Sequence, residues 1–134
     1  MRILVIDDQA AVGRSLKRFF AGEAEIDLDT DPREALARLA VDARYDLLLC
    51  DMEMGTMTGV EFEAALRAAH PELLDRLVFI SGGPVGEAAS AFLFAPGRRW
   101  VEKPFDPPRL REMITRFRPG GPGSGSSSGG PAGA

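Results

Sequence analysis

The sequence predicts an α/β protein: a five-stranded parallel sheet with helices on both faces. Three short, almost continuous apolar runs indicate strands covered on both sides, namely Ile3–Ile6, Leu47–Cys50 and Leu77–Ile80. Segments with helical spacing of apolar residues separate these runs along the chain. Strands and helices that alternate in this way form right-handed crossovers on a parallel sheet. Two weaker strand patterns, Glu25–Asp29 and Arg99–Glu102, complete the five.

The pattern places one helix after every strand. The second helix has the clearest start, because Asp31 is a favourable cap, Pro32 suits the first helical position and Glu34 stands three residues after the cap. Apolar residues mark the other four helices: Val12, Leu16, Phe19 and Phe20; Phe62, Leu66 and Ala69; Val85, Ala88, Ala89 and Phe92; and Leu110, Met113, Ile114 and Phe117.

A change of composition divides the chain into two parts. Its 134 residues fit one domain of ordinary size. From Pro119 to Ala134 every residue is Gly, Ser, Pro or Ala. Such a stretch cannot bury enough surface to offset its ordering entropy. We therefore expect a folded domain over residues 1–118 and a disordered tail or linker over 119–134.

Composition and charge exclude several classes of protein. With 45% hydrophobic and 27% charged residues, the chain is typical of a soluble folded protein. The net charge of −4 argues against direct nucleic-acid binding. No apolar run approaches the ~20 residues of a membrane span, and the run that ends at Ile6 is too short for a secretory signal. We expect a cytoplasmic protein that contacts neither nucleic acid nor membrane.

Polar side chains stand at the carboxyl ends of four expected strands, the edge at which such sheets bind ligands. Asp7 and Asp8 follow the first strand, Asp51 the third, Ser81 the fourth and Lys103 the fifth. Three carboxylates held close repel one another, and a hard cation such as Mg²⁺ relieves the repulsion. A lysine and a hydroxyl beside them suit a phosphoryl group. The set predicts phosphoryl transfer, with an aspartate as nucleophile.

These motifs resemble the receiver domain of two-component response regulators over roughly residues 2–118. The resemblance implies the flavodoxin-like receiver fold, with strand order 2-1-3-4-5. It also implies a phosphorelay receiver that takes a phosphoryl group from a sensor histidine kinase or a phosphotransfer protein. The matching motifs, in order, are Asp7-Asp8, the run Asp51-Met52-Glu53-Met54-Gly55-Thr56-Met57-Thr58-Gly59, Ser81-Gly82 and Lys103-Pro104-Phe105.

The resemblance implies a role for each residue of the site. Asp51 would be the phosphoacceptor. Asp8 and Asp51 would bind Mg²⁺ through carboxylate oxygens, and Glu53 through its backbone carbonyl. Asp7 would reach the ion mostly through a bound water, and Lys103 would contact the phosphoryl group.

The resemblance also implies a conformational switch. Ser81 would move toward the phosphoryl group, Trp100 has the position of the family's aromatic switch, and the Lys103–Pro104 peptide would be cis. The fourth helix, fifth strand and fifth helix would form the face for an unknown downstream protein. The uncharged segment Ala88–Ala95 suits such a face or simple core packing. The domain would be a monomer or a phosphorylation-dependent dimer, either free-standing or part of a hybrid kinase.

Three residues depart from the family pattern. Gly55 stands where proline is usual, which loosens the loop. Trp100 is bulkier than the usual tyrosine or phenylalanine. Glu53 lies two residues after Asp51, where side chains tune hydrolysis of the acyl phosphate. A carboxylate there can orient the attacking water or repel it, and the sequence leaves both open.

A signalling switch, which catalyses only its own phosphorylation and dephosphorylation, is therefore favoured over an enzyme. The alternative is a Mg²⁺-dependent phosphatase that forms an aspartyl phosphate. Such enzymes carry a second aspartate two residues after the nucleophile, where this chain has Glu53. No cap insertion is present to enclose a small substrate. A nucleotide-binding module is less favoured, because neither the dinucleotide fingerprint nor the P-loop follows any strand.

Overall fold

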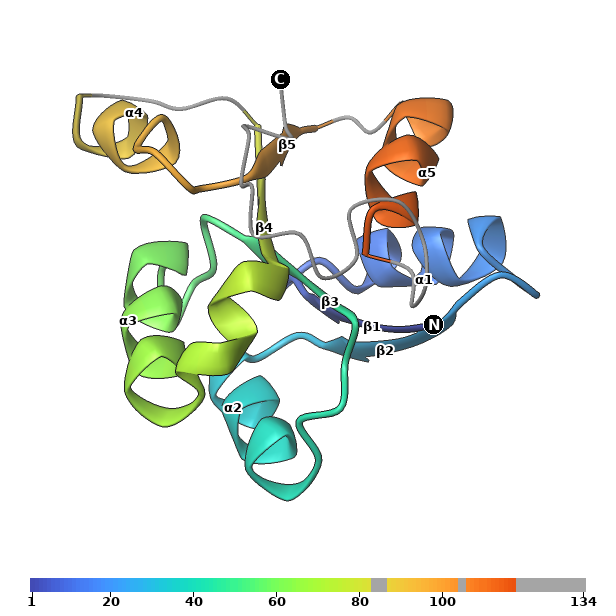
Figure 1. The fold of residues 1–134 in the computed structure, drawn as a ribbon, viewed down its shortest axis with the longest axis horizontal. Coiled ribbons are helices and arrows are strands. Elements are labelled where there is room, and N and C mark those ends of the chain that lie inside the picture. Colours follow the sequence, from blue (N-terminus) through green and yellow to red (C-terminus); the bar gives the residue numbers. More distant parts are fainter. Residues whose placement is uncertain (83–86, 104–105, 118–134) are drawn as a thin grey trace.

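The computed structural model describes residues 1–82, 87–103 and 106–117 of the chain. Three expectations concern residues wholly or partly outside this range: the tail over 119–134, the cis Lys103–Pro104 peptide and the helical position of Val85. Strands and helices alternate along the described chain (Figure 1): β1 (Arg2–Ile6), α1 (Ala10–Phe19), β2 (Glu25–Asp29), α2 (Pro32–Val41), β3 (Leu47–Asp51), α3 (Gly59–Ala69), the 3₁₀ helix η1 (Pro71–Arg76), β4 (Leu77–Ser81), α4 (Glu87–Leu93), β5 (Trp100–Glu102) and α5 (Pro107–Thr115).

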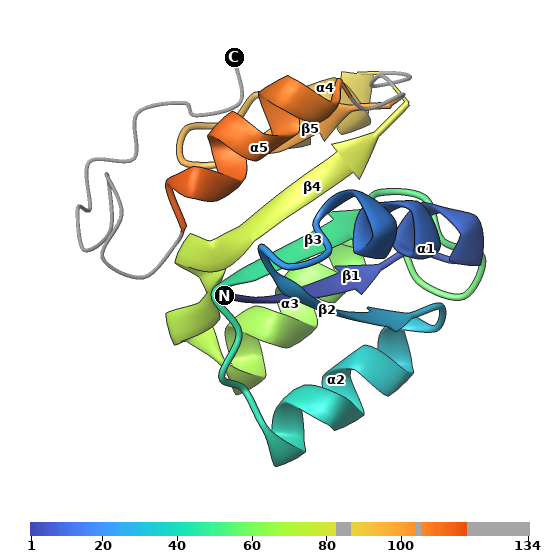
Figure 2. The same cartoon turned by 90° about the vertical axis from the view of Figure 1, so that its right-hand side faces the viewer.

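The strands form one parallel sheet in the order β2-β1-β3-β4-β5. This confirms the predicted α/β fold and strand order. Helices α1 and α5 lie on one side of the strands and α2, α3 and α4 on the other (Figure 1), and Figure 2 looks onto the side that α1 and α5 cover. Both faces are therefore covered, as expected of a doubly wound sheet.

Each face of the sheet has its own apolar core. Leu4 and Phe79 point into the core shared with α2, α3 and α4. Ile3 and Val78 point into the core shared with α1 and α5. Successive strand residues face opposite sides, so both sets of positions must be apolar. This is why the central strands appear as continuous apolar runs in the sequence and not as alternating ones.

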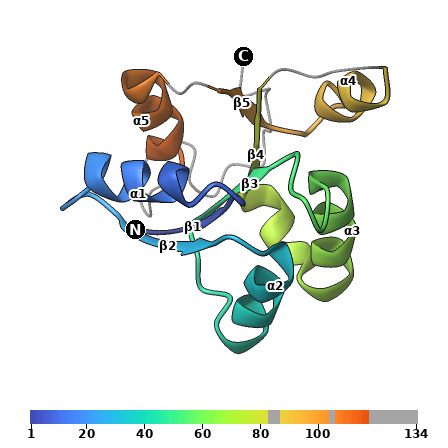
Figure 3. The same ribbon diagram turned by 180° about the vertical axis from the view of Figure 1, so that it is seen from behind.

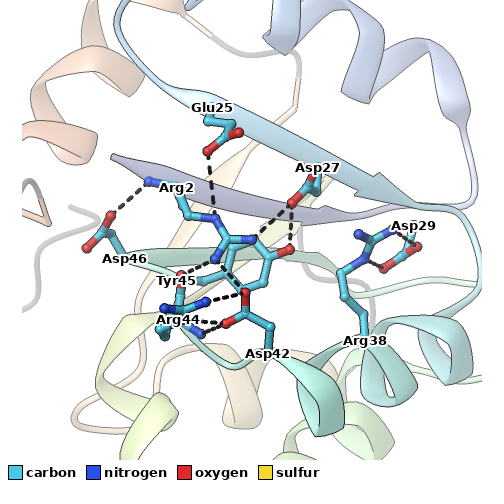
Figure 4. Close-up of polar contacts among 9 residues, drawn as sticks. All are labelled: Arg2, Glu25, Asp27, Asp29, Arg38, Asp42, Arg44, Tyr45 and Asp46. Atoms are coloured by element: carbon cyan, nitrogen blue, oxygen red, sulfur yellow. Dashed lines mark hydrogen bonds and ion pairs between the residues drawn. The ribbon is translucent and has the colours of Figure 1, made fainter.

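The edge strand β2 carries acids on one face, and all of them have partners (Figure 4). Glu25 and Asp27 lie 3.8 and 3.6 Å from the Arg2 guanidinium. Asp29 receives two hydrogen bonds from Arg38, at 2.8 and 3.1 Å. A register slip of one residue would turn these acids toward the opposite core. The strand expected over Glu25–Asp29 is thus confirmed as the edge strand β2, and its paired acids also specify the register.

The predicted start of α2 is confirmed, with Asp31 as the cap and Pro32 as the first helical residue, although the full capping box does not form. The Asp31 carboxylate accepts a hydrogen bond from the backbone N–H of Arg33, one residue before the capping-box position at Glu34. A capping box closes instead at α3, where Thr58 Oγ1 accepts from the Glu61 N–H and the Glu61 carboxylate accepts from the Thr58 N–H. The spacing of three residues from Thr58 to Glu61 is the sequence signal of this capping box. This box fixes the start of α3 just beyond the loop that follows β3.

Two further features differ from the expectations. Phe20 is buried with 1% of its surface exposed, whereas Phe19 is 36% exposed although both were expected on the core face of the first helix. The 3₁₀ helix Pro71–Arg76 was not anticipated, and it connects α3 to β4.

Among the helices that the structure describes, none is both long and apolar enough to cross a membrane.

Candidate functional site

Three strand ends bring an acid cluster and a lysine together. Asp51 is the last residue of β3, Asp7 and Asp8 follow β1, and Lys103 follows β5. One oxygen from each of the three carboxylates lies within 4.8 Å of the others. Lys103 Nζ lies 3.0 Å from Asp7 Oδ2 and 3.4 Å from Asp51 Oδ2. Residues expected to share one site therefore do lie side by side.

Asp7 is fully buried and carries one oxygen without a hydrogen bond. Its Oδ1 accepts from the backbone N–H of Gln9 at 2.9 Å. Among the described residues, none donates a hydrogen bond of acceptable geometry to Oδ2, although Lys103 faces it as an ion-pair partner. A buried carboxylate oxygen is costly without partners. This oxygen therefore suits a site that is completed by a cation or its bound water.

Asp51 is buried, with 6% of its surface exposed. Its Oδ1 accepts from the backbone N–H of Glu53 at 3.2 Å. Burial raises the pKa of Asp51 above its ordinary value, and the charge of Asp7 adds to this; the Glu53 N–H and Lys103 act in the opposite direction but are outweighed. A second positive charge beside Asp51 would favour the ionised carboxylate, which is the nucleophilic form.

Lys103 is positioned through its own backbone, because its N–H donates to the Ser81 carbonyl at 2.7 Å. Burial acts to lower the pKa of Lys103, but its contact with Asp7 and the charges of Asp51 and Asp7 prevail, so that the pKa is raised. The side chain is therefore an ammonium at neutral pH. It supplies a fixed positive charge beside the Asp51 carboxylate.

The remaining predicted residues surround this cluster. Ser81 ends β4 and is buried, with 6% of its surface exposed. The Asp8 and Glu53 side chains are exposed at the same edge of the sheet. Trp100, the first residue of β5, is half-buried and meets the Phe94 ring edge-on, with centroids 5.6 Å apart. The tryptophan therefore has a packing contact, and its role as a switch stays a prediction.

The loop between β3 and α3 is closed by backbone contacts. Glu53 and Thr58 form an antiparallel bridge, and the Gly59 N–H donates to the Met52 carbonyl at 2.9 Å. A Cβ on Gly59 would lie 2.8 Å from Met52 Sδ and 3.0 Å from Met52 Cα, so a side chain is excluded there. At Gly55 a Cβ would have nothing within 4 Å. The loop therefore needs glycine at 59 and only tolerates it at 55.

The sheet order and the helices on both faces define a flavodoxin-like α/β domain. Residues 3–115 match the family model of the response regulator receiver domain. This chain belongs to that family, the phosphoacceptor domains of two-component signalling.

Curated relatives are longer than this chain. It is 35% identical over 119 residues to the response regulator MprA of Mycobacterium avium, covering 88% of this chain and 50% of MprA. It is 28% identical over 120 residues to the transcriptional regulatory protein FlgR of Helicobacter pylori, covering 88% of this chain and 30% of FlgR. The chain thus spans half or less of the length of these relatives.

Solved receiver domains have the same fold over most of their length. The chemotaxis response regulator CheY4 of Vibrio cholerae superposes with a TM-score of 0.70 at 26% identity, covering 87% of this chain and 97% of CheY4. The receiver domain from the hybrid histidine kinase CckA superposes with a TM-score of 0.68 at 27% identity, covering 87% and 98% of the two chains. A chemotaxis response regulator and the receiver domain of a hybrid histidine kinase are therefore both similar to this chain.

Proposed function

We propose that this chain is a Mg²⁺-dependent phosphorelay receiver that takes its phosphoryl group on Asp51. The observation that supports this most is the position of the Lys103 ammonium, 3.4 Å from Asp51 and 3.0 Å from Asp7. A nucleophilic carboxylate, neighbouring acids and a fixed cation at one strand edge match the needs of phosphoryl transfer, which is mostly positioning and charge neutralisation.

The residues at this edge fit Mg²⁺. Their oxygens lie within 4.8 Å of one another, and hard cations prefer carboxylate, carbonyl and water oxygens. Asp8 and Asp51 would hold the ion through carboxylates, Glu53 through its carbonyl and Asp7 through a water. When bound, the ion would neutralise charge on the carboxylates and on the phosphoryl oxygens.

In the proposed reaction, one Asp51 oxygen forms a P–O bond with the phosphorus of a phosphohistidine. The P–N bond breaks, and its electron pair returns to the imidazole of the kinase or phosphotransfer protein. Lys103 exchanges its contact with the Asp51 carboxylate for a phosphoryl oxygen, and the Ser81 hydroxyl donates to another. The buried position of Asp51 limits access of water to the acyl phosphate.

The same exchange would signal to a partner. The acyl phosphate carries about two negative charges where the Asp51 carboxylate carried one, and Lys103 and Ser81 respond at the ends of β5 and β4. An equilibrium between two arrangements then shifts. We place the output at the face formed by α4, β5 and α5, where Phe94 is 66% exposed beside Trp100. The partner is a downstream protein or a second, phosphorylated copy of the domain.

Acetyl phosphate with Mg²⁺ tests the proposal. The intact mass should rise by one phosphoryl group, and Asp51→Asn or removal of Mg²⁺ with a chelator should abolish the gain. Asp75→Asn is the matched control, because Asp75 is an exposed acid of the 3₁₀ helix and should leave the gain intact. A mass gain that survives in Asp51→Asn contradicts the proposal. Sustained turnover of small phosphoesters would favour the aspartyl-phosphate phosphatase instead.

A further inference from the structure

A nearly buried ion pair links α3 to the loop between α4 and β5. The Glu63 side chain on α3 is 11% exposed, and that of Arg98 in the loop is 24% exposed. Arg98 Nη2 donates to Glu63 Oε1 at 2.6 Å and Arg98 Nε donates to Glu63 Oε2 at 2.9 Å. This two-bond geometry is the strongest form of a carboxylate–guanidinium contact. Because Glu63 is shielded from water, removal of Arg98 leaves its carboxylate with only the longer contact of 3.2 Å to Arg67.

The same guanidinium also contacts α4. Arg98 Cζ lies 3.7 Å from the centroid of the Phe92 ring. Phe92 meets Phe79 of β4 edge-on, with centroids 5.3 Å apart, and Phe79 pairs in register with Trp100 of β5. Helices α3 and α4 lie on the same side of the sheet in opposite views (Figures 1 and 3). The Arg98 side chain therefore contacts both α3 and α4. Its backbone leads directly into β5.

The elements joined by this ion pair also carry the residues of the proposed reaction. β4 ends at Ser81, and Lys103 follows β5 five residues after Arg98. α3 begins directly after the loop that follows Asp51. We propose that the Glu63–Arg98 ion pair positions α4 and the loop before β5 against α3, and so sets how readily the domain takes a phosphoryl group. This inference rests on the proposed function.

The direction of the effect follows from the contacts of Lys103. The ion pair belongs to the arrangement in which the Lys103 ammonium contacts Asp7 and Asp51. In the proposed reaction Lys103 exchanges the Asp51 contact for a phosphoryl oxygen, and a shift of the end of β5 would accompany that exchange. A contact that stabilises the first arrangement opposes the second. Glu63 and Arg98 are thus positioning residues that restrain phosphorylation.

The test compares Glu63→Gln and Arg98→Gln with the control Arg67→Gln. Arg67 also contacts Glu63, at 3.2 Å, but from one turn further along α3, so its loss leaves the link to the loop intact. Phosphorylation by acetyl phosphate with Mg²⁺ is followed by intact mass. We expect the two test variants to react about fivefold faster or more, the usual range for coupling between sites, and the control to stay within about twofold. Acrylamide should quench Trp100, the one tryptophan of the chain, more strongly in both test variants.

Folding is checked by circular dichroism. Should Arg98→Gln not fold, Arg98→Lys keeps the charge but not the two-bond geometry, and it should react at an intermediate rate. Unchanged or slower phosphorylation in both test variants, or equal acceleration in Arg67→Gln, overturns the inference while the proposed function stands. A wild-type chain that takes no phosphoryl group overturns the proposed function and this inference with it.

Discussion

The Tyr45 hydroxyl donates a hydrogen bond of 2.6 Å to Asp27 Oδ2, which connects the segment before β3 to the edge strand β2. The ring is buried, with 1% of its surface exposed, and the Arg2 guanidinium lies 4.3 Å from its centroid (Figure 4). Burial raises the pKa of Tyr45 above its ordinary value of 10, and the hydrogen bond and charge of Asp27 add to this; Arg2 and Arg38 oppose it less strongly.

This relationship predicts a loss of stability in alkali. In the unfolded chain Tyr45 releases its proton near pH 10, and in the folded chain at higher pH. The folded state then holds the proton that the unfolded state has lost, so the stabilisation is complete below pH 10 and declines as pH rises through the folded pKa. Because Tyr45 is the only tyrosine, absorbance at 295 nm reports its ionisation alone.

Urea denaturation between pH 9 and 12 measures the effect on stability. The midpoint for the wild type should fall above pH 10 more steeply than that of Tyr45→Phe, which has no phenol to ionise. A phenolate signal that appears at the same pH in the folded chain and in urea would contradict the assignment.

Glycine at position 59 should be required for packing. Gly59→Ala would place a Cβ 2.8 Å from Met52 Sδ and 3.1 Å from Phe79 Cε1. We expect the free energy of unfolding to fall by about 1–3 kcal/mol, as is usual for overpacking. Gly55→Ala is the control, because its Cβ meets nothing within 4 Å, and it should change stability by less than about 0.5 kcal/mol. Urea denaturation compares the two, and equal losses would argue against the contact.

The capping box at the start of α3 should contribute measurably to stability. Thr58→Ala removes the hydroxyl that accepts from the Glu61 N–H at 3.2 Å. The free energy of unfolding should fall by about 1 kcal/mol, the typical value for such a cap. Thr56→Ala, an exposed change in the same loop, should be almost neutral. A loss at Thr56 that matches the loss at Thr58 would mean that the loop responds to any truncation.

Mg²⁺ should stabilise the fold through the acid cluster. A ligand that binds only the folded state raises the free energy of unfolding as its concentration exceeds the dissociation constant. The thermal midpoint of the wild type should therefore rise with added Mg²⁺, because the acids of the cluster lie within 4.8 Å of one another. Asp8→Asn should show a much smaller rise, and Asp75→Asn should respond like the wild type. A wild-type midpoint that is indifferent to Mg²⁺ would contradict the metal site.

The α/β pattern, the strand positions and the candidate site were all predictable from sequence. Continuous apolar runs such as Leu47–Cys50 identify buried parallel strands, and parallel strands bring their carboxyl ends to one edge. Asp7, Asp51 and Lys103 were expected together for this reason alone, and the structure places them within contact distance.

Side-chain pairing was decided only by the tertiary structure. Glu63 and Arg98 are 35 residues apart, and neither lies in a motif that predicts the other. Phe19 and Phe20 are neighbours with identical side chains, yet 36% of Phe19 is exposed against 1% of Phe20, which packs into the core shared by β1, α1 and α5. Periodicity along one chain fixes which face of an element is apolar. Which distant charges meet depends on how helices lie across the sheet, and that geometry has no local sequence signal.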